Sequence, residues 1–368
     1  MRARLKPLGE QTIVITGATS GNGLAAAREA VRRGARVVLA ARNREALDAV
    51  GRDLERAGGK VAVCAADVAN EADVERIAET AVQAFGGFDS WVNDAAAATY
   101  GAMEDVPMED HRRIFDVNYH GLLMGSLVAA RHLRARGGGG AIVNLGSVLC
   151  DRAMIYQGPY SATKAAVQAA TDALRMELER DRTGISVTLI KPGSINTPYP
   201  EHARNYMDAP PRLPPMLYDP ALVAEAILFA CENSRRQLYV GGSGWLISVA
   251  GKLAPRATDL AMEAFGVGAQ QKPGDPGDPE KRDNLYAPRS DGEARGRQDV
   301  FVRRTSVFLQ AQTQPLLVPF AAAAAGAEMA AGLARRLLGG RRGRRSAARP
   351  EPGLARPYEI RSIGADHG

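Results

Sequence analysis

Residues 12–23 read TIVITGATSGNG, and this stretch decides the fold that the rest of the sequence is expected to adopt. Thr12 to Thr16 is a short β-branched run that predicts a strand, and Leu24 to Arg33 has helical composition. The turn between them has the glycine pattern G-x-x-x-G-x-G. Glycines are needed where the backbone turns sharply and where its N–H groups approach a pyrophosphate at the positive end of a helix. The stretch therefore predicts a dinucleotide site, with an ordinary glycine-rich loop as the alternative.

Strand and helix signals alternate along the chain after this turn. The expected strands are residues 36–41, 60–65, 88–93, 141–145, 185–190 and 237–240, and the expected helices are residues 44–56, 71–85, 108–134, 165–178 and 221–233. Such alternation is typical of a parallel sheet with helices on both faces. We predict an α/β fold with a doubly wound parallel sheet (Rossmann fold), forming one domain over residues 1–250 and binding ligands beyond the carboxyl ends of its strands.

Composition and charge exclude several other classes of protein. The chain has 368 residues and a hydrophobic content of 45%, which suits a globular protein with a sizeable core. Seven arginines lie within residues 335–349, a segment without acidic residues, so the rest of the chain is nearly neutral despite a net charge of +6. We therefore expect no nucleic-acid partner. The cysteines and histidines lack the spacing of metal ligands, so we expect no metal. The apolar run near the N-terminus is too short for a signal peptide, and we expect a cytoplasmic protein.

The end of the second predicted strand carries information about the cofactor. Sites that prefer NAD place a carboxylate there for the ribose 2′-hydroxyl, whereas an arginine accommodates the 2′-phosphate of NADP. This strand ends at Arg42 without a carboxylate, so we expect NADP(H) rather than NAD(H); a solvated arginine is the alternative. Asp67 and Val68, after the third strand, are expected on the adenine side, although Asp67 would look the same as a helix N-cap.

Tyr160 and Lys164 lie one helical turn apart, so both side chains share one helix face. A phenol titrates at about pH 10 in isolation. A neighbouring ammonium and a positively charged nicotinamide ring both favour the phenolate, which makes Tyr160 a proton donor or acceptor near neutrality. Ser147 follows the strand 141–145, so both hydroxyls are expected to reach one substrate oxygen. A surface pair on an amphipathic helix is the alternative for Tyr160 and Lys164.

Taken together, these residues resemble the classical short-chain dehydrogenases/reductases over roughly residues 10–245. The order and spacing of that family are matched by residues 16–23, Asn93 to Ala96, Asn118, Ser147, Tyr160 with Lys164, Pro192-Gly193 and Thr197. The chain departs from the family at Asn22, where isoleucine is common, and at Asp94 and Ala96, where the usual motif has Asn and Gly. The resemblance implies cofactor contacts from the matched loops: Gly17, Thr19, Ser20, Gly21, Gly23, Asn93, Pro192, Gly193 and Thr197.

The resemblance also implies the catalytic roles. Asn118 would join the lysine to a proton-relay water, and Ser147 would hold the substrate oxygen. Tyr160 would be the acid or base, while Lys164 would lower its pKa and bond the nicotinamide ribose. A capping or kinking role is the alternative for Asn118, because Asn is a poor helix former. The family commonly pairs long helices from two subunits, here 108–134 and 165–180, so we expect a homodimer or homotetramer.

We therefore expect NADP(H)-dependent interconversion of an alcohol and a carbonyl by hydride transfer. Residues 196–220, rich in proline and in apolar and aromatic side chains, predict a lid or a permanent pocket wall. Together with Leu149, Met154, Ile155 and Tyr156, they favour a hydrophobic substrate. A non-catalytic dinucleotide sensor or scaffold is the alternative, although such a protein has no need of a proton donor. An epimerase or dehydratase is disfavoured because the G-x-x-G-x-x-G turn is absent.

The last third of the chain exceeds the usual length of the family. Residues 251–315 contain a Gly/Pro/Asp linker and a charge-rich stretch, and we expect a loosely ordered extension. Residues 316–368 hold an alanine-rich apolar stretch and the arginine cluster. Three alternatives remain for residues 316–368: a solvated helix with a disordered tail, a contact with a membrane surface or another subunit, and a membrane span. Glu328 would cost a span roughly 2.5–3.5 kcal/mol, so we expect at most weak membrane association through residues 316–349.

Overall fold

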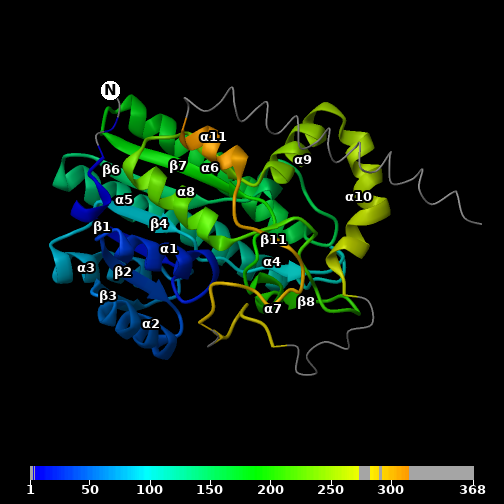
Figure 1. The fold of residues 1–368 in the computed structure, drawn as a ribbon, viewed down its shortest axis with the longest axis horizontal. Helices are drawn as coiled ribbons and strands as arrows, with labels where there is room; N and C mark the ends of the chain where they lie inside the picture. The colour runs from blue at the N-terminus through cyan, green and yellow to red at the C-terminus, as the bar shows by residue number, and fades with distance from the viewer. Residues whose placement is uncertain (1–2, 4, 273–281, 290–291, 315–368) are drawn as a thin grey trace, which may run out of the picture. The chain divides into compact units, whose positions relative to one another are not determined.

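The computed structural model describes residues 3, 5–272, 282–289 and 292–314, and a seven-stranded parallel sheet forms its centre (Figure 1). The strand order is β3-β2-β1-β4-β6-β7-β10. The strands are β1 (Thr12–Thr16), β2 (Arg36–Ala41), β3 (Lys60–Ala65), β4 (Ser90–Asn93), β6 (Gly140–Leu145), β7 (Ile185–Pro192) and β10 (Gln237–Val240). Each neighbouring pair is parallel, with Thr12 opposite Arg36 in β1–β2. The predicted doubly wound sheet is confirmed.

Helices cover both faces of this sheet because successive strand residues point to opposite sides. Ile13 and Ile15 of β1 pack into the core under one helix layer, whereas Val14 packs into the core under the other. The first layer contains α1 (Gly21–Arg32), α2 (Arg44–Arg56) and α8 (Pro220–Glu232). The second contains α3 (Glu71–Phe85), α4 (Met108–Phe115), α5 (Gly121–Arg136) and α6 (Gly158–Arg180).

Several element bounds differ from the sequence-based expectation; α6, for example, begins at Gly158 rather than Ala165. The fourth strand begins at Ser90 rather than Phe88, and just before it lies the side chain of Asp89. Its Oδ2 accepts a 2.8 Å hydrogen bond from the Thr12 N–H, and its Oδ1 pairs with Lys6 and Arg136. The expected long helix 108–134 is interrupted by a π-helical turn, Asp116–His120, between α4 and α5. Hydrophobic periodicity does not reveal such a turn.

Short elements build the region above the carboxyl ends of the strands. These are α7 (Tyr199–His202), the 3-10 turn Val148–Cys150, and the paired strands β5 (Thr99–Tyr100) with β8 (Arg204–Asn205) and β9 (Leu217–Tyr218) with β11 (Val302–Arg303). The 3-10 turn Leu8–Glu10 instead precedes β1. The pairing of β9 with β11 joins the segment after β7 to the last third of the chain.

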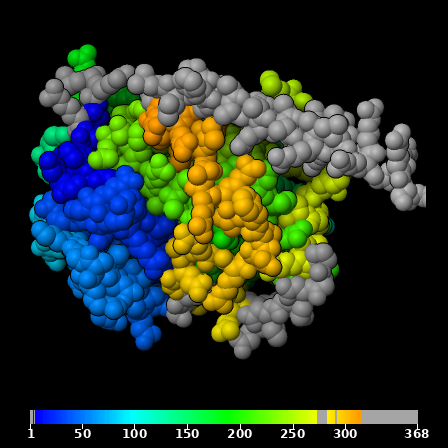
Figure 2. Space-filling model, viewed as in Figure 1, coloured from blue at the N-terminus to red at the C-terminus, as the bar shows by residue number. Residues whose placement is uncertain are grey.

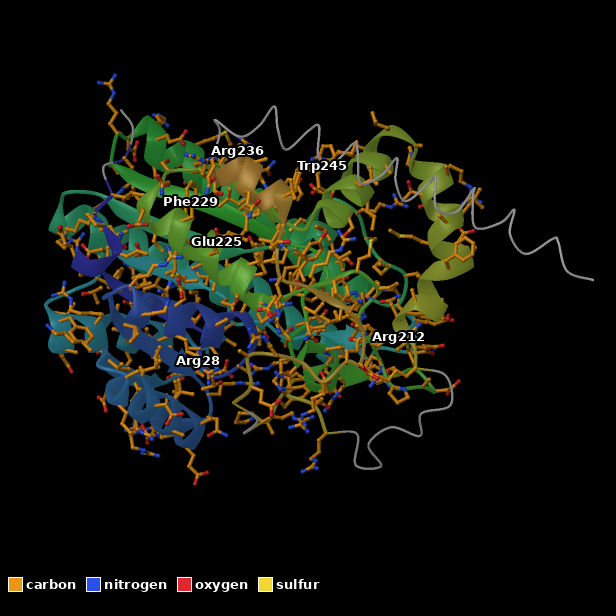
Figure 3. The ribbon with its side chains drawn as sticks, viewed as in Figure 1. Arg28, Arg212, Glu225, Phe229, Arg236 and Trp245 are labelled. Atoms are coloured by element: carbon orange, nitrogen blue, oxygen red, sulfur yellow. The ribbon has the colours of Figure 1, made fainter. Side chains whose placement is uncertain are left out.

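The chain beyond β10 is more regular than expected. It forms α9 (Gly242–Leu253), α10 (Pro255–Gln270), β11 and α11 (Val307–Thr313), so the boundary expected at residue 250 falls inside α9. Trp245 of α9, labelled in Figure 3, lies near α11. Its ring packs against Phe308 of α11, with ring centroids 5.1 Å apart. Gln312 of α11 hydrogen-bonds the backbone N–H and carbonyl of Tyr239 in β10, both at 2.9 Å. The described part of the extension is thereby docked on the sheet domain.

The alanine-rich stretch and the arginine cluster expected over residues 316–368 lie outside the described residues. Within the described ranges, none of the helices has the length and apolar character that crossing a membrane requires.

Candidate active site

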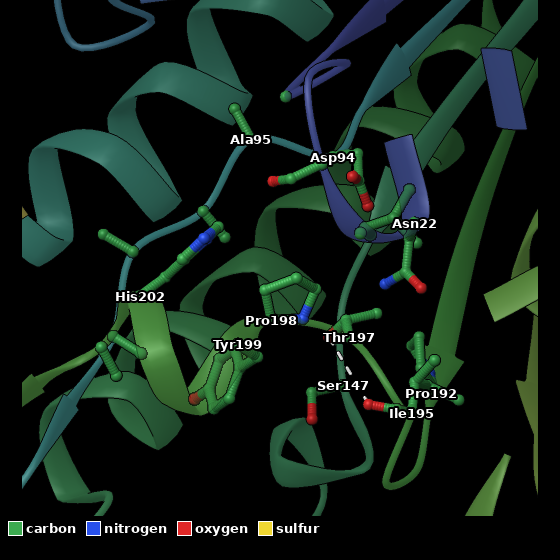
Figure 4. A pocket seen from close by; sticks show the side chains of 18 of the residues that line it. Asn22, Asp94, Ala95, Ser147, Pro192, Ile195, Thr197, Pro198, Tyr199 and His202 are labelled. Carbon is green, nitrogen blue, oxygen red and sulfur yellow. Dashed lines mark hydrogen bonds between the residues drawn. The ribbon is translucent and has the colours of Figure 1, made fainter. Parts of the chain in front are cut away.

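A cavity opens at the carboxyl ends of the strands, where the strand order reverses between β1 and β4 (Figure 4). Such a position is the usual ligand site of an open α/β sheet. Most of the predicted site residues line it: Gly17, Thr19, Ser20, Gly21, Arg42, Asp67, Val68, Ser147, Tyr160, Lys164, Pro192, Gly193 and Thr197. The structure therefore brings the predicted cofactor and catalytic residues together in one place.

The glycine turn is shaped by close backbone approaches. Gly17 has a φ of +71°, and a Cβ there would lie 2.9 Å from the Ala95 Cα. A Cβ on Gly23 would lie 2.4 Å from the Gly17 carbonyl oxygen, so Gly23 is required for packing and does not itself line the cavity. The turn leads directly into α1, whose N-terminus carries partial positive charge.

The residues at this turn fit a dinucleotide. Asn22 lies on the cavity wall, and its Oδ1 is buried without a hydrogen-bond partner among the described residues. The unpaired Asn22 oxygen can accept a hydrogen bond from a ligand hydroxyl, and the backbone N–H groups at the start of α1 can bind phosphate oxygens. A dinucleotide offers both kinds of group. Thr197 packs over the same turn, its Cγ2 being 3.6 Å from the position that a Gly21 Cβ would take.

Ser147, Tyr160 and Lys164 come from two adjacent elements. Ser147 follows the end of β6, and its Oγ accepts a 3.1 Å hydrogen bond from the Leu149 N–H, which caps the turn Val148–Cys150. Tyr160 and Lys164 lie in the first turns of α6, and both are buried. Lys164 Nζ lies 5.5 Å from the centre of the Tyr160 ring. The arrangement puts two hydroxyls and one cation at the same end of the cavity.

Burial sets the electrostatics of this group. It raises the pKa of the Tyr160 phenol, and charge on Cys150 and Asp94 acts in the same direction, whereas hydrogen bonds from Ser147 and Tyr199 lower it. Burial also lowers the pKa of Lys164, against the opposing effect of charge on Cys150 and Asp94. Phenolate formation at neutral pH therefore requires a further positive charge in the cavity.

Three predicted residues are not on the cavity wall: Gly23, described above, Asn118 and Asn93. Asn118 lies in the π-helical turn, and its side chain makes hydrogen bonds of 2.8 and 2.9 Å to the Ala97 N–H and carbonyl and of 3.0 Å to Thr163 Oγ1. Its side chain thus fixes the strand-4 loop against α6. Asn93 is also buried away from the cavity, where it contacts Trp91, Ser126 and Asn144. We assign Asn93 a packing role rather than a cofactor contact.

Arg42 and Asp67 mark the opposite end of the cavity. The Arg42 guanidinium donates to the carbonyl oxygens of Asn284, Leu285 and Tyr286, and burial lowers its pKa. The Asp67 carboxylate pairs with Arg113 at 2.6 Å. The N-cap of α3 is Asn70, so Asp67 is not the cap that the sequence left open as an alternative.

Several residues of this site were not predicted. Asp94 lies against the glycine turn, and burial raises its pKa to about 7, while the Lys164 charge and the Gly23 N–H lower it. Tyr199 stacks edge-on to Tyr160, with ring centroids 5.4 Å apart. Asp94 was visible as a departure from the family motif, and Tyr199 as an aromatic residue beside Thr197. Residues of α9 and of the extension also line the cavity: Ser243, Gly244 and Ile247 of α9, and Asn284, Pro288, Arg289 and Gly292 of the extension.

The proline-rich segment 196–220 forms a packed wall of the cavity. Leu217 and Met207 are buried, and Leu213 is held by Gln298 through hydrogen bonds of 3.0 Å to its N–H and carbonyl. The Tyr206 N–H donates to the Tyr100 carbonyl at 2.7 Å. These contacts hold residues 196–220 in place, as expected for a permanent pocket wall and not for a free lid. Across the described ranges, His, Cys, Asp and Glu side chains form no group of three or more that would hold a metal ion.

Comparison with known proteins agrees with this geometry. A family model described as short chain dehydrogenase matches residues 11–207. The chain is 43% identical to the oxidoreductase YxnA of Bacillus subtilis (strain 168) over 317 residues, which is 86% of this chain and 89% of the relative. It is 35% identical to 3beta-hydroxysteroid dehydrogenase 1 of Eggerthella lenta, covering 63% of this chain and 90% of that protein. The fold resembles L-sorbose reductase from Gluconobacter frateurii, solved with NADPH and L-sorbose, with a TM-score of 0.56, 26% identity and coverage of 66% and 98%.

Proposed function

The chain belongs to the short-chain dehydrogenases and is an oxidoreductase that acts on CH–OH groups, and on that premise we propose that it uses NADP(H) to interconvert an alcohol and a carbonyl on a hydrophobic substrate. The observation that carries the proposal is the meeting of Ser147, Tyr160 and Lys164 in a cavity whose far end holds Arg42. Hydride transfer needs an oriented carbonyl, a proton donor for its oxygen and exclusion of water, and these residues supply the first two.

In the proposed mechanism the chain's own residues position and protonate the substrate. Ser147 Oγ donates a hydrogen bond to the substrate oxygen, which fixes the carbonyl against Tyr160. In reduction, Tyr160 gives its proton to that oxygen as negative charge develops there; in oxidation, it takes the proton from the alcohol. When bound, the cofactor supplies or accepts the hydride, and its oxidised ring adds positive charge beside the phenol. Lys164 adds a second positive charge from the same helix face.

Preference for NADP(H) is supported by Arg42. Arg42 follows β2, at the place where an arginine accommodates a 2′-phosphate. Three of its hydrogen bonds go to carbonyl oxygens, which leaves two of the five guanidinium N–H groups for a phosphate. Arg289 lines the same cavity, but its guanidinium donates to the carbonyl oxygens of Glu201 at 2.7 Å and Arg282 at 2.8 Å, so the proposal rests on Arg42.

A hydrophobic substrate is supported by the walls near Tyr160. Leu149, Met154, Leu213, Met216 and Ile247 line the cavity, and Tyr100 and Tyr199 pack around the Tyr160 ring. One relative of the chain is named for action on 3β-hydroxysteroids. Steroid-like or polycyclic secondary alcohols and their ketones are therefore the first compounds to screen.

We also propose that the protein forms a homodimer or homotetramer through α5 and α6. Leu127 of α5 is 43% exposed and Met176 of α6 is 58% exposed, which leaves apolar side chains on both long helices uncovered. Light scattering on wild type and on Leu127→Arg tests this. Loss of the oligomer in the variant is expected, and a monomeric wild type would contradict the assembly.

The test of the cofactor is titration of the purified protein with NADPH and NADH, followed by nucleotide fluorescence, for wild type and Arg42→Ala. We expect wild type to bind NADPH more tightly than NADH, and Arg42→Ala to lose roughly 1–3 kcal/mol of NADPH affinity, as for a hydrogen bond to a charged group, with little change for NADH. Equal effects on both nucleotides would overturn the role of Arg42. Absence of binding by either would favour the non-catalytic scaffold.

A further inference from the structure

The extension crosses the cofactor cavity with its backbone. Two described segments are involved, residues 282–289 and residues 292–297, which we call the strap. In Figure 2 the strap and the residues after it, coloured yellow to orange, lie on the surface beside the blue N-terminal elements. Asn284, Pro288, Arg289 and Gly292 line the cavity itself. The strap is therefore part of the same site as the glycine turn and Arg42.

The first segment is anchored at the end of the cavity that holds Arg42. Leu285 is fully buried in the core between β-strands and helices, and its carbonyl accepts a 3.1 Å hydrogen bond from Arg113 Nε as well as one from Arg42. Asp283 pairs with Arg204 at 2.8 Å. The Tyr286 hydroxyl donates to the buried Asp110 carboxylate at 2.8 Å. Buried apolar, ionic and hydrogen-bonded contacts thus hold this segment.

The second segment lies over the glycine turn. The Glu293 carbonyl accepts a 3.0 Å hydrogen bond from the Gly21 N–H at the start of α1. The Gly296 N–H donates to the Asn196 carbonyl at 3.1 Å, and a Cβ on Gly296 would lie 2.5 Å from the Thr197 carbonyl oxygen. Arg295 pairs with Asp219 at 2.8 Å. The backbone therefore passes from the turn to the loop after β7 in close contact with both.

We propose that the strap is a second cofactor-binding segment that encloses the dinucleotide and slows its release from the protein. The proposal rests on the proposed use of a nicotinamide dinucleotide. A ligand that reaches from Arg42 past Gly21 to Thr197 lies under contacts made by the strap at each of these three points. Release of such a ligand then requires contacts of both described segments to break, those of residues 282–289 with Arg42 and those of residues 292–297 with the glycine turn and the loop after β7.

The test is the release rate of NADPH from the full-length protein, followed by loss of bound-nucleotide fluorescence after addition of excess NADP⁺. Gly296→Ala forces the strap away from Thr197, and Leu285→Ala loosens the other end. We expect each variant to release NADPH at least 10-fold faster than wild type, because each removes an anchor without removing a group of the reaction. Arg295→Ala, which removes only a partly exposed ion pair, is expected to raise the rate about 2- to 5-fold.

Phe301→Ala is the matched control, since Phe301 belongs to the same extension and is 82% exposed. Its release rate should equal that of wild type. Hydrogen exchange of wild type provides a measurement that does not depend on the folding of any variant: amides of residues 282–289 and 292–297 should gain protection when NADPH binds. Two results would overturn the proposed role of the strap. One is binding of NADPH without a gain in amide protection, and the other is a wild-type release rate in both Gly296→Ala and Leu285→Ala. A wild type that binds neither NADPH nor NADH overturns the proposed function as well.

Discussion

Lys164 Nζ lies 5.5 Å from the centre of the Tyr160 ring and donates a 2.7 Å hydrogen bond to the Leu145 carbonyl oxygen. The ammonium is therefore held beside the phenol by the end of β6 and acts on it through space. Burial raises the pKa of Tyr160 and lowers that of Lys164, so it opposes the charged form of each group. The phenolate needed for alcohol oxidation is therefore expected to be favoured by the oxidised, cationic nicotinamide ring, whereas reduction uses the neutral phenol.

Tyr160→Phe removes the proton donor while keeping the ring that fills the site. We expect kcat to fall by roughly 10²–10⁴-fold, the usual contribution of a positioned acid or base. The Kd for NADPH should stay within about threefold, because the ring packing is retained. Steady-state kinetics and nucleotide fluorescence on the same preparation measure both quantities. Wild-type turnover in this variant would falsify the assignment of Tyr160.

Tyr199→Phe removes a hydroxyl that lowers the pKa of Tyr160 and that donates a 2.9 Å hydrogen bond to Gln157 Oε1. Loss of a bond worth about 1 kcal/mol corresponds to roughly 0.7 pH units. In alcohol oxidation the phenolate is the active form, so we expect the rising limb of the pH–rate profile to move to higher pH by about that amount. An unshifted profile would assign Tyr199 to substrate packing alone.

Tyr100→Phe is the control for this experiment. Tyr100 lies in the same aromatic cluster, 6.0 Å from Tyr199 between ring centroids, but its buried hydroxyl has no partner among the described residues. Its removal is expected to leave the pH–rate profile in place.

Asp94→Asn tests the effect of a titratable carboxyl at the glycine turn. The folded-state pKa of Asp94 is raised to about 7, above the ordinary value of an aspartate, so the folded protein holds this proton more tightly than the unfolded chain does. The contribution of Asp94 to stability is therefore full at low pH and is lost as pH rises from about 4 through 7. We expect wild type to melt below Asp94→Asn at pH 8 and the two melting temperatures to converge towards pH 4. A constant difference across this range would contradict the shift.

The same substitution should change the pH dependence of cofactor binding. An ionised Asp94 near the start of α1 opposes phosphate groups of the ligand, so NADPH affinity in wild type is expected to fall as pH rises above 7. The 2′-phosphate of NADPH also titrates in this pH range. That effect is the same for wild type and Asp94→Asn, so the difference between the two proteins reports on Asp94 alone. Parallel affinity–pH curves for the two proteins would exclude a role for Asp94 in binding.

Lys191→Met tests a buried ion pair behind the serine loop. Lys191 and Asp151 are 2% and 0% exposed and lie 2.9 Å apart, and Asp151 follows the turn that begins after Ser147. Removing the lysine leaves a buried carboxylate whose remaining partners are the Tyr239 hydroxyl at 2.8 Å and Lys252 at 3.5 Å, so we expect a loss of unfolding free energy towards the lower end of the about 3–5 kcal/mol that breaking a buried ion pair costs. Urea denaturation should show a lower midpoint at unchanged slope. Lys60→Met, at an exposed position of β3, is the control and should change stability by less than about 0.5 kcal/mol.

Sequence patterns predicted the sheet domain well because its determinants are local. The bounds of α2, α3, β2 and β10 follow directly from hydrophobic periodicity. Ser147, Tyr160 and Lys164 were predictable because each lies at the end of a strand or the start of a helix, and such ends meet at one edge of a parallel sheet. Asn93 has the same position in sequence terms, but its side chain points to the buried partners Trp91 and Asn144. The direction in which a side chain points at the end of a strand is decided by the packing around it, which the sequence pattern does not reveal.

The contribution of the extension was not predictable for a different reason. The strap contacts Arg42 and Gly21 through backbone carbonyl oxygens. Every residue has such an oxygen, so no pattern of side chains in the sequence predicts these contacts. Its composition of Gly, Pro and charged residues is also that of a loose linker. The strap is ordered by contacts with residues far away in the sequence, such as the core around Leu285 and the carboxylate of Asp110.

The hydrogen bond between Arg42 and the Asn284 carbonyl joins positions 242 residues apart. During synthesis, the glycine turn and the end of β2 leave the ribosome long before the residues that cover them. At 5–20 residues per second the interval is roughly 12–50 s, far longer than a helix needs to form. The nascent chain must therefore keep its half-built nucleotide site soluble for that time, and nicotinamide dinucleotides of the cell reach the site before its last wall is made.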